Sequence, residues 1–215
     1  LEYYFVHIRL NFIGRSGCDY ASSRGEYLNG KIVAKLLGFA FIDAADVIFF
    51  DESGKYDAKR TMPILRERLS YTEYAVIPGF YGSMPNDTIR TFSRGGSDIT
   101  GSIVAAAADA DLYENWTDVS GFLIADPRVV DNPQVMKTVT YRELRELSYM
   151  GASVLHEDAI YPARMANVPI NIRNTNAPED PGTMITGEAE AYSDEGENRI
   201  ITGIAGSKDF TVVAL

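Results

Sequence analysis

Residues 93–101 read Ser-Arg-Gly-Gly-Ser-Asp-Ile-Thr-Gly, and an apolar, alanine-rich run continues from them to Ala110. Alanine is the best intrinsic helix former, so the sequence predicts a helix over 99–110. Ser97 or Asp98 can cap its first turn by accepting a free backbone N–H. Two glycines and an arginine before a helix offer backbone amides, the helix dipole and a guanidinium to an anion. The stretch predicts either a carboxylate or phosphate site, or an ordinary capped helix after a glycine-rich turn.

Composition limits the kind of protein. The chain has 215 residues, 46% hydrophobic and 23% charged, enough for one sizeable core with a small appendage. Its formal net charge of −10 argues against a nucleic-acid partner, because phosphate backbones are bound by clustered Lys and Arg. Cys18 is the single cysteine, which excludes an intrachain disulfide and indicates a reducing compartment. No apolar run approaches the roughly 20 residues that cross a bilayer. We therefore expect a soluble, cytoplasmic protein without a membrane partner.

Helical and extended segments alternate along most of the chain. Apolar residues at helical spacing predict further helices over 24–37, 59–69, 141–149 and 157–167. Short apolar runs predict strands over 39–42, 47–50, 75–77, 112–116 and 168–172. This alternation predicts an α/β fold with a mainly parallel sheet. The loop 78–82 follows a predicted strand, at the end where open α/β sheets bind ligands.

The composition changes near the C-terminus. Residues 187–199 are acidic and polar, which is typical of a linker. Two apolar β segments come after them, at 200–205 and 210–214, and they are too few for a domain. We expect one main domain over 1–186, a linker over 187–199, and the beginning of a second unit over 200–215. On this interpretation the sequence is truncated.

Three further groups of residues are candidates for chemistry. Trp116-Thr117-Asp118-Val119 precedes Asp126-Pro127-Arg128, and a strand ending in Thr and Asp with a later Arg can bind a nucleotide or form a surface turn. Glu26 follows Ser-Ser-Arg-Gly at an expected helix start, where it can interact with the helix dipole or hold a substrate ammonium. His156 is one of two histidines, and we expect a structural rather than a catalytic role for it.

The order of these motifs resembles that of the aspartate kinases. Ser-Arg-Gly-Glu, Gly-Phe-Tyr-Gly, Ser-Arg-Gly-Gly-Ser-Asp, Trp-Thr-Asp-Val, Asp-Pro-Arg and Gly-Ala-x-Val-Leu-His occur in the family's order over about 19–186. The resemblance implies the amino-acid kinase fold, a three-layer αβα sandwich with a mainly parallel sheet. Residues 200–215 resemble the start of an ACT-type ferredoxin-like regulatory domain. Residues 1–18 match the family poorly.

The resemblance also implies an activity. It is transfer of the ATP γ-phosphoryl group to the β-carboxylate of L-aspartate, giving 4-phospho-L-aspartate, the first step of lysine, threonine and methionine biosynthesis. ATP with Mg²⁺ would be the cofactor, no metal site made by the protein alone is expected, and the family leads us to expect a homodimer. Because a carboxylate is ionised at neutral pH, this acceptor needs no general base, and catalysis reduces to alignment and charge neutralisation.

The family pattern assigns roles to particular residues. Arg94 would hold a substrate carboxylate and Glu26 the α-ammonium, and Asp98 would organise the charges as the second catalytic residue beside Arg94. The remaining residues of the aspartate pocket would be Phe80, Gly95, Gly96 and Ser97. The nucleotide would be held by Thr117, Asp118, Leu123, Arg128 and Ser153.

The sequence departs from the family in three respects. The N-terminal Lys-Phe-Gly-Gly motif, whose charge would neutralise the ATP phosphates, is absent. Ser153 and Glu157 stand where many members have lysine and proline, and Leu123 stands where a tyrosine is common. We therefore expect this chain to be weakly active or inactive. A non-catalytic regulatory or assembly subunit, or a kinase for another carboxylate or carbamate, remains the alternative.

Overall fold

The fold is known from a computed structural model, which describes residues 2–14, 17–149, 157–187 and 201–206. The chain divides into two compact units, Leu1–Ala108 and Asp109–Leu215, and each is described by itself. Within the described ranges, no helix combines the length and the apolar character that crossing a membrane requires.

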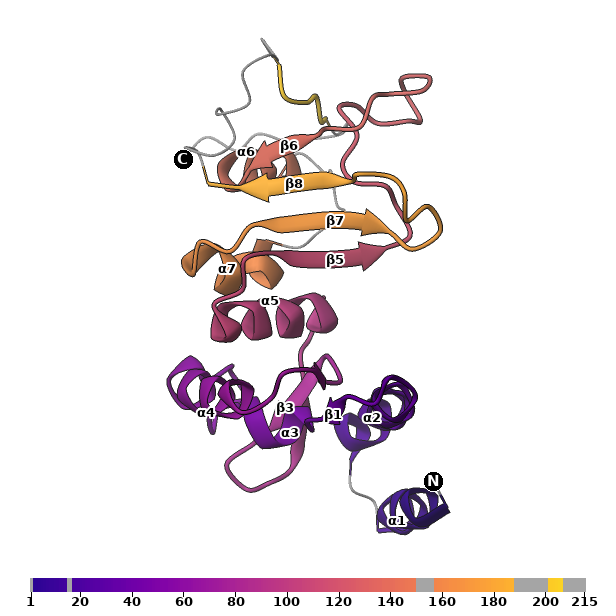
Figure 1. The fold of residues 1–215 in the computed structure, drawn as a ribbon, viewed down its shortest axis with the longest axis vertical. Coiled ribbons are helices and arrows are strands. Elements are labelled where there is room, and N and C mark those ends of the chain that lie inside the picture. The colour runs from indigo at the N-terminus through magenta and orange to yellow at the C-terminus, as the bar shows by residue number, and fades with distance from the viewer. Residues whose placement is uncertain (1, 15–16, 150–156, 188–200, 207–215) are drawn as a thin grey trace, which may run out of the picture. The chain divides into compact units, whose positions relative to one another are not determined.

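The first unit is built around a core of apolar side chains. Ile48, Leu65, Tyr81 and Ile103 are fully buried in it. Two short strand pairs contribute: β1 (Ala40–Phe41) and β2 (Ala75–Val76) are parallel, and β3 (Tyr81–Ser83) and β4 (Ile89–Thr91) form an antiparallel hairpin. In order, the elements are α1 (Glu2–Ile13), α2 (Cys18–Leu37), β1 (Ala40–Phe41), α3 (Ala44–Val47), α4 (Ala58–Ser70), β2 (Ala75–Val76), β3 (Tyr81–Ser83), β4 (Ile89–Thr91) and α5 (Gly96–Ala108) (Figure 1).

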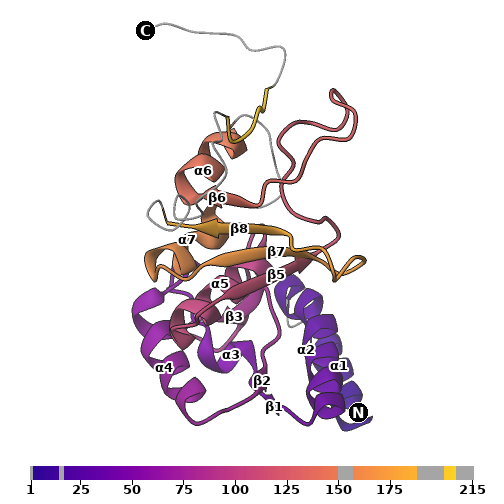
Figure 2. The same cartoon turned by 45° about the horizontal axis from the view of Figure 1, so that its top comes forward.

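Helix α2 differs from its prediction at one end only. It ends at Leu37, and Gly38 caps it in the left-handed conformation, as the sequence predicts. It begins at Cys18, however, six residues before the expected start, so the Ser-Arg-Gly-Glu motif lies inside the helix. Helix α1 lies alongside it through edge-to-face contacts of Tyr4 with Tyr27 and of Phe12 with Tyr20 (Figure 2). Sequence reasoning made no prediction for α1.

The strand predicted over 47–50 is wrong at its start. Val47 is instead the last residue of the short helix α3. That helix begins after Asp43, whose carboxylate caps it by accepting from the Ala45 N–H at 3.1 Å. Residues 49 and 50 form only isolated β-bridges, to Ser83 and Tyr56. The apolar run is nevertheless buried, and burial by itself does not distinguish a strand from a helix end.

The second unit contains a four-stranded sheet in the order β5 (Tyr113–Thr117), β7 (Ile170–Asn174), β8 (Thr183–Thr186), β6 (Thr138–Thr140) (Figure 1). The pairs β5/β7 and β6/β8 are parallel and β7/β8 is antiparallel. Three of the five strand pairs among the described residues are therefore parallel, which confirms the α/β prediction. The elements are β5 (Tyr113–Thr117), β6 (Thr138–Thr140), α6 (Tyr141–Tyr149), α7 (Glu157–Met165), β7 (Ile170–Asn174) and β8 (Thr183–Thr186).

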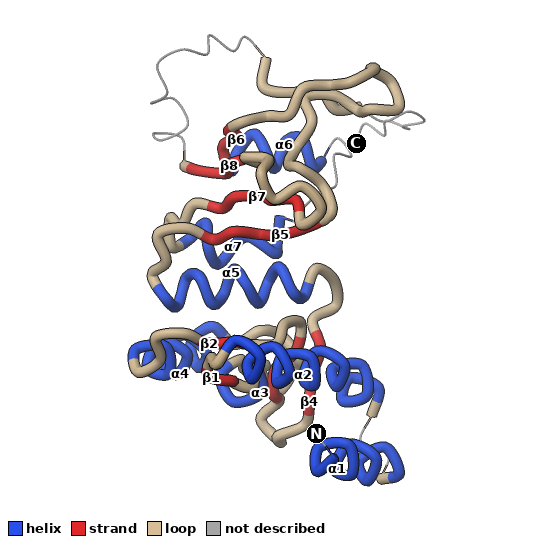
Figure 3. The backbone as a smooth tube through the Cα atoms, turned by 45° about the vertical axis from the view of Figure 1, so that its right-hand side comes forward, coloured by secondary structure: helices blue, strands red, loops and turns tan. Residues whose placement is uncertain are grey.

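A long loop joins β5 to β6 and carries most of the candidate nucleotide residues (Figure 3). The strand expected over 200–205 is wrong in the part that can be compared, since residues 201–206 contain no strand. These residues instead pair with the loop through the Ile204 N–H, which donates to the Ile124 carbonyl at 2.7 Å. The expected linker beyond Gly187 and the segment 210–214 lie outside the described residues.

Candidate functional site

The first candidate half-site is the turn that leads into α5. Gly95 has φ 56°, a left-handed conformation that glycine adopts without a Cβ penalty. Its carbonyl accepts the first helical bond, from the Ile99 N–H at 2.9 Å, so α5 begins at Gly96. Ser97 and Asp98 therefore lie in the first turn and do not cap the helix from outside, which corrects the prediction for them. The first amides of the helix have no intrahelical acceptor and can bind an anion.

The loop 78–80 lies directly against this turn. A Cβ at Gly79 would be 3.2 Å from both Cα and Oγ of Ser97, so little space separates the two segments. Phe80 has φ 64°, which is uncommon for a residue with a side chain. Its N–H donates to Oγ1 of Thr100 at 3.0 Å, and that hydroxyl donates to the Gly96 carbonyl at 2.8 Å. Thr100, which sequence reasoning missed, therefore fixes the strained Phe80 backbone against the helix start.

Two of the three charged residues proposed for this half-site, Arg94 and Glu26, are exposed. Arg94 and Ser97 are solvent-accessible, and Asp98 is half-buried. Glu26 is exposed in the third turn of α2, so the expectation of a first-turn position is wrong. Among the described residues, no hydrogen bond or ion pair joins Glu26 to Arg94. The structure thus brings Phe80, Gly96 and Ser97 together, whereas in the described part of the chain Glu26 makes no direct bond to Arg94.

Arg24 is a buried residue of the Ser-Arg-Gly-Glu motif for which sequence reasoning proposed no role. Its side chain is 8% exposed, and its guanidinium carbon lies 4.5 Å from the ring centres of Tyr20 and Tyr27 and 5.4 Å from that of Tyr81. It also donates to Oγ of Ser23 at 2.9 Å. This cation–π cluster links α2, which carries Glu26, to β3, whose first residue follows Phe80.

Tyr81 and Asp43 continue the cluster into the core. The Tyr81 hydroxyl donates to Oδ1 of Asp43 at 2.8 Å. Burial raises the pKa of Tyr81 far above its usual value, and the nearby Asp43 carboxylate raises it further. The hydroxyl therefore keeps its proton and remains a donor at neutral pH. A sequence signal for this pair does not exist, because 38 residues separate them.

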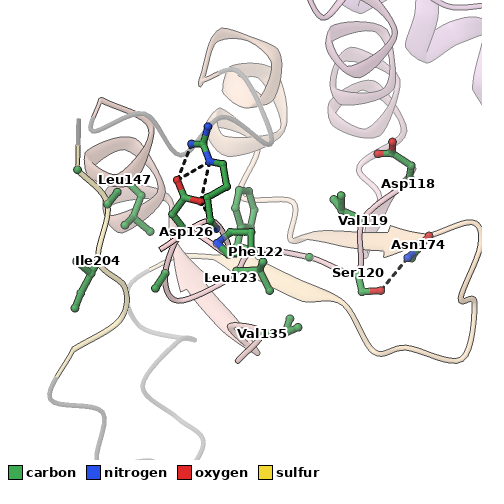
Figure 4. Close-up of a pocket in the computed structure, with 16 residues that line it drawn as sticks. Asp118, Val119, Ser120, Phe122, Leu123, Asp126, Val135, Leu147, Asn174 and Ile204 are labelled. Atoms are coloured by element: carbon green, nitrogen blue, oxygen red, sulfur yellow. Dashed lines mark hydrogen bonds and ion pairs between the residues drawn. The ribbon is translucent and has the colours of Figure 1, made fainter. Parts of the chain in front are cut away.

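The second candidate half-site is a cavity of about 630 Å³ in the second unit. It lies where β5 ends and the loop 118–137 begins (Figure 4). The carboxyl end of a parallel strand is the usual ligand position in an open α/β sheet. The cavity is lined by Asp118, Val119, Ser120, Gly121, Phe122, Leu123, Ala125, Asp126, Pro127, Arg128, Val135, Leu147, Asn174, Ile204, Ala205 and Gly206.

Polar side chains occupy one end of this cavity. Asn174 Nδ2 donates to Oγ of Ser120 at 2.9 Å, and that hydroxyl donates to Oδ2 of Asp180 at 2.5 Å (Figure 4). Thr117 Oγ1 donates to Oδ1 of Asp118 at 3.2 Å. Ser120 and Asn174 come from different strand ends, β5 and β7, which pair in parallel. Parallel pairing therefore assembles a polar end that no single motif contains.

Asp126 and Arg128, which also line the cavity, form an ion pair. Arg128 Nη2 lies 2.6 Å from Oδ2 of Asp126, and its Nε lies 3.0 Å from Oδ1. The hydrogen bond from the Arg128 side chain, followed by that from the Arg128 backbone, lowers the pKa of Asp126 to about 2. The same hydrogen bond raises the pKa of Arg128. This pair fixes the direction in which the guanidinium projects from an otherwise exposed loop.

The cavity brings most of the predicted nucleotide residues together. Asp118, Leu123 and Arg128 line it, and Thr117 adjoins it through its hydrogen bond to Asp118. Ser153 and His156 lie outside the described residues. Sequence reasoning missed the apolar lining residues, because they come from separate elements and carry no motif. Those with the largest side chains are Phe122, Val135, Leu147 and Ile204.

Metal-ligating side chains do not cluster in either half-site. Within the described residues, no group of three or more His, Cys, Asp or Glu side chains is placed to hold a metal ion. Mg²⁺ in kinases is held largely by substrate phosphates together with one or two carboxylates. The Asp118 carboxylate in the cavity fits that partial role.

Comparisons with known proteins identify the family of this chain. The family model for the amino acid kinase family matches residues 6–174, well over half of the chain. The chain therefore belongs to the amino acid kinase family, and its fold is the amino-acid kinase fold. Among solved structures, that of Clostridium acetobutylicum aspartate kinase is similar at 56% identity with a TM-score of 0.87, covering 95% of this chain and 46% of that one.

Other relatives agree with this assignment. Aspartokinase 3 of Bacillus subtilis is 36% identical over 203 residues, which cover 89% of this chain and 43% of the relative. E. coli aspartokinase III, solved in complex with aspartate and ADP, is 26% identical with a TM-score of 0.70, covering 79% of this chain and 40% of that one. The chain thus spans less than half the length of each of these relatives.

Proposed function

We propose that this chain is the catalytic part of an aspartate kinase. It would transfer the γ-phosphoryl group of Mg·ATP to the β-carboxylate of L-aspartate. The observation that carries the proposal is the cavity at the end of β5, which gathers Asp118, Leu123 and Arg128 in one nucleotide-sized space. The relative that was solved with aspartate and ADP supports this choice of ligands.

The reaction requires little from the protein in covalent chemistry. An oxygen of the β-carboxylate attacks the γ-phosphorus, and the bond to the β–γ bridging oxygen breaks to release ADP. Since the acceptor is already ionised, no proton has to be removed from it. Catalysis therefore depends on aligning two anions and on neutralising charge as the phosphoryl group moves.

The turn before α5 is the proposed aspartate-binding site. Arg94 would hold the substrate carboxylate as a catalytic residue, with the amides of Gly95, Gly96 and Ser97 as additional donors. Asp98, half-buried in the first turn of α5, would organise these charges as the second catalytic residue. Phe80 would form the apolar side of the pocket. The α-ammonium would be held by Glu26, whose exposed carboxylate projects from α2.

The cavity in the second unit is the proposed nucleotide-binding site. Arg128, directed by Asp126, would contact the phosphates. Asp118 would contribute a carboxylate oxygen to the Mg²⁺ that travels with ATP, and Mg²⁺ would neutralise charge on the phosphates. Thr117 and Leu123 would contact the nucleoside, and Ser153 remains a proposed contact.

The organisation of the whole protein is inferred from the family resemblance. We propose that the kinase domain extends to residue 186, that residues 187–199 form a linker, and that residues 200–215 begin an ACT-type domain. We also propose that the enzyme is a cytoplasmic homodimer.

Acyl phosphate formation tests the proposal. The chain is incubated with L-aspartate and Mg·ATP, and hydroxylamine traps any 4-phospho-L-aspartate as the hydroxamate. We expect a weak aspartate-dependent signal, and we expect Arg94→Ala to abolish it or to raise the KM for aspartate at least about tenfold, as loss of a charge-assisted bidentate contact does.

Arg66→Ala is the matched control, because Arg66 is an exposed arginine on α4 that belongs to neither proposed binding site. It should leave the signal unchanged. A chain that binds Mg·ADP in calorimetry yet forms no hydroxamate would favour the non-catalytic subunit. Equal kinetics for Arg94→Ala and Arg66→Ala would refute the role of Arg94.

A further inference from the structure

Residues 201–206 pack onto the second unit, although they come after the expected linker. The Ile204 N–H donates to the Ile124 carbonyl at 2.7 Å, which joins the segment to the loop that lines the nucleotide cavity. The same loop closes on itself nearby, where the Met136 N–H donates to the Phe122 carbonyl at 2.7 Å. The segment therefore adds to an already paired loop instead of standing apart from it.

A second contact fixes the segment to α6. The Thr202 hydroxyl donates to Oε1 of Glu143 at 2.5 Å. The other carboxylate oxygen of Glu143 accepts from the backbone N–H and the hydroxyl of Thr140, both at 2.8 Å, in a capping box that starts α6. Glu143 is thus held in place by the helix start, and Thr202 binds to a preorganised acceptor.

Gly203, between these two contacts, allows close approach. A Cβ at this position would lie 2.5 Å from Cε of Met136 and 3.3 Å from Cδ2 of Leu147. Leu147 belongs to the cavity lining, as do Ile204, Ala205 and Gly206. Figure 4 shows Leu147 and Ile204 on the same side of the cavity. Residues 204–206 are therefore part of the cavity wall.

We propose that Ile204 is a nucleotide-binding residue that forms the apolar wall against the base, and that Thr202 is the residue that positions it. The proposal rests on the proposed nucleotide site in this cavity. An aromatic base needs apolar surface on its faces, and the cavity supplies it from Phe122, Leu123, Val135, Leu147 and Ile204. Ile204 is 66% exposed, which suits a side chain that a ligand covers.

Calorimetric binding of Mg·ADP to the whole chain tests this role. Ile204→Ala removes apolar surface from the cavity wall, and we expect it to raise the Kd for Mg·ADP about fivefold. Ile201→Ala is the matched control, since Ile201 has the same side chain, is 63% exposed in the same segment, and does not line the cavity. It should leave the Kd unchanged.

Thr202 is tested through its hydroxyl. Thr202→Val keeps the shape of the side chain and removes the hydroxyl that donates to Glu143. We expect it to raise the Kd for Mg·ADP about threefold. Thr202→Ser restores the donor and should restore the Kd, and the affinity for L-aspartate should not change in either variant. A loss of Mg·ADP affinity that Thr202→Ser does not reverse would contradict the hydrogen bond to Glu143 as its cause.

The outcomes separate this proposal from the one on which it rests. If the unaltered chain binds no Mg·ADP, the proposed nucleotide site and the proposed role of Ile204 are both contradicted. If the unaltered chain and Ile204→Ala bind Mg·ADP equally well, the role of Ile204 is contradicted and the proposed nucleotide site is not. If Ile201→Ala raises the Kd for Mg·ADP as much as Ile204→Ala does, the role of Ile204 is also contradicted.

Discussion

Tyr81 lies at the centre of the first unit's core with no exposed surface, and its hydroxyl has one carboxylate partner, Asp43. A buried hydroxyl without a partner would destabilise the fold, so the position of Asp43 matters for the core. The same carboxylate oxygen accepts from the Ala45 N–H and so begins α3. One carboxylate therefore satisfies a core hydroxyl and caps a helix.

Tyr81→Phe should lower the free energy of unfolding by about 1.5–3 kcal/mol, because it removes one hydrogen bond to a charged group while keeping the ring. Chemical denaturation measures the change. Tyr71→Phe is the matched control, since Tyr71 is 84% exposed, and it should change the stability by less than about 0.5 kcal/mol. Equal stability of the two variants would contradict the importance of the Asp43 contact.

The ion pair of Asp126 with Arg128 makes a prediction about pH. The folded pKa of Asp126, about 2, lies below its usual value near 3.8, so the pair is complete above pH 4 and is lost as the pH falls through 2. An NMR titration of the Asp126 carboxyl carbon should show a midpoint near 2. In Arg128→Ala the midpoint should rise toward the usual value. An unchanged midpoint in that variant would mean that Arg128 is not the cause.

Among the secondary-structure elements, the pairing of β7 with β8 depends on one turn residue. Gly182 precedes β8 with φ 74°, and a Cβ there would overlap the Ile172 carbonyl oxygen. The next residue, Thr183, pairs with Ile172 in the antiparallel β7/β8 ladder, so the pairing requires this close approach. Only glycine fits, because both the conformation and the space exclude a side chain.

Two glycine substitutions should therefore change stability in opposite directions. Gly182→Ala combines an unfavourable backbone conformation with a backbone overlap and should cost about 2–4 kcal/mol. Gly25→Ala, in the interior of α2 with no atom near its Cβ position, should stabilise the protein by about 0.5–1 kcal/mol. Thermal unfolding of both variants measures the difference. A stabilised Gly182→Ala variant would contradict the turn geometry.

The elements also show what periodicity can and cannot predict. Helix α6 has the predicted bounds, 141–149, because its apolar positions recur at helical spacing and its first residues include a capping box. The first six residues of α2 and the hairpin β3/β4 were missed. The start of α2 is polar apart from its aromatic and alanine positions, and β3 and β4 are only three residues each, too short for a periodic signal.

At the level of the whole molecule, the two half-sites belong to different compact units. The turn with Arg94 lies in the first unit, and the cavity with Arg128 lies in the second. Each half-site is assembled by contacts within its own unit, as with Phe80 and Thr100 in the first and Ser120 and Asn174 in the second. Ligand binding to each half-site should therefore be separable.

Reciprocal binding measurements test this separation. Arg128→Ala should weaken Mg·ADP binding about tenfold and leave the Kd for L-aspartate unchanged, because it removes a cation from the phosphate site only. Arg94→Ala should weaken L-aspartate binding and leave the Kd for Mg·ADP unchanged. Calorimetry with each ligand alone gives the four values. A variant that weakens both ligands equally would contradict separate half-sites.

Local sequence patterns alone determined the α/β class and the existence of α5, which was predicted over 99–110 and spans Gly96–Ala108. They also singled out Arg94, Asp118 and Arg128 as candidates, because periodicity, capping and motif spacing are properties of neighbouring residues. Tertiary structure decided which distant residues meet. The Tyr81–Asp43 bond, the Ser120–Asn174 pair and the docking of Ile204 on the cavity join positions far apart in the chain. No local pattern encodes those contacts, since they depend on strand pairing and on packing between elements.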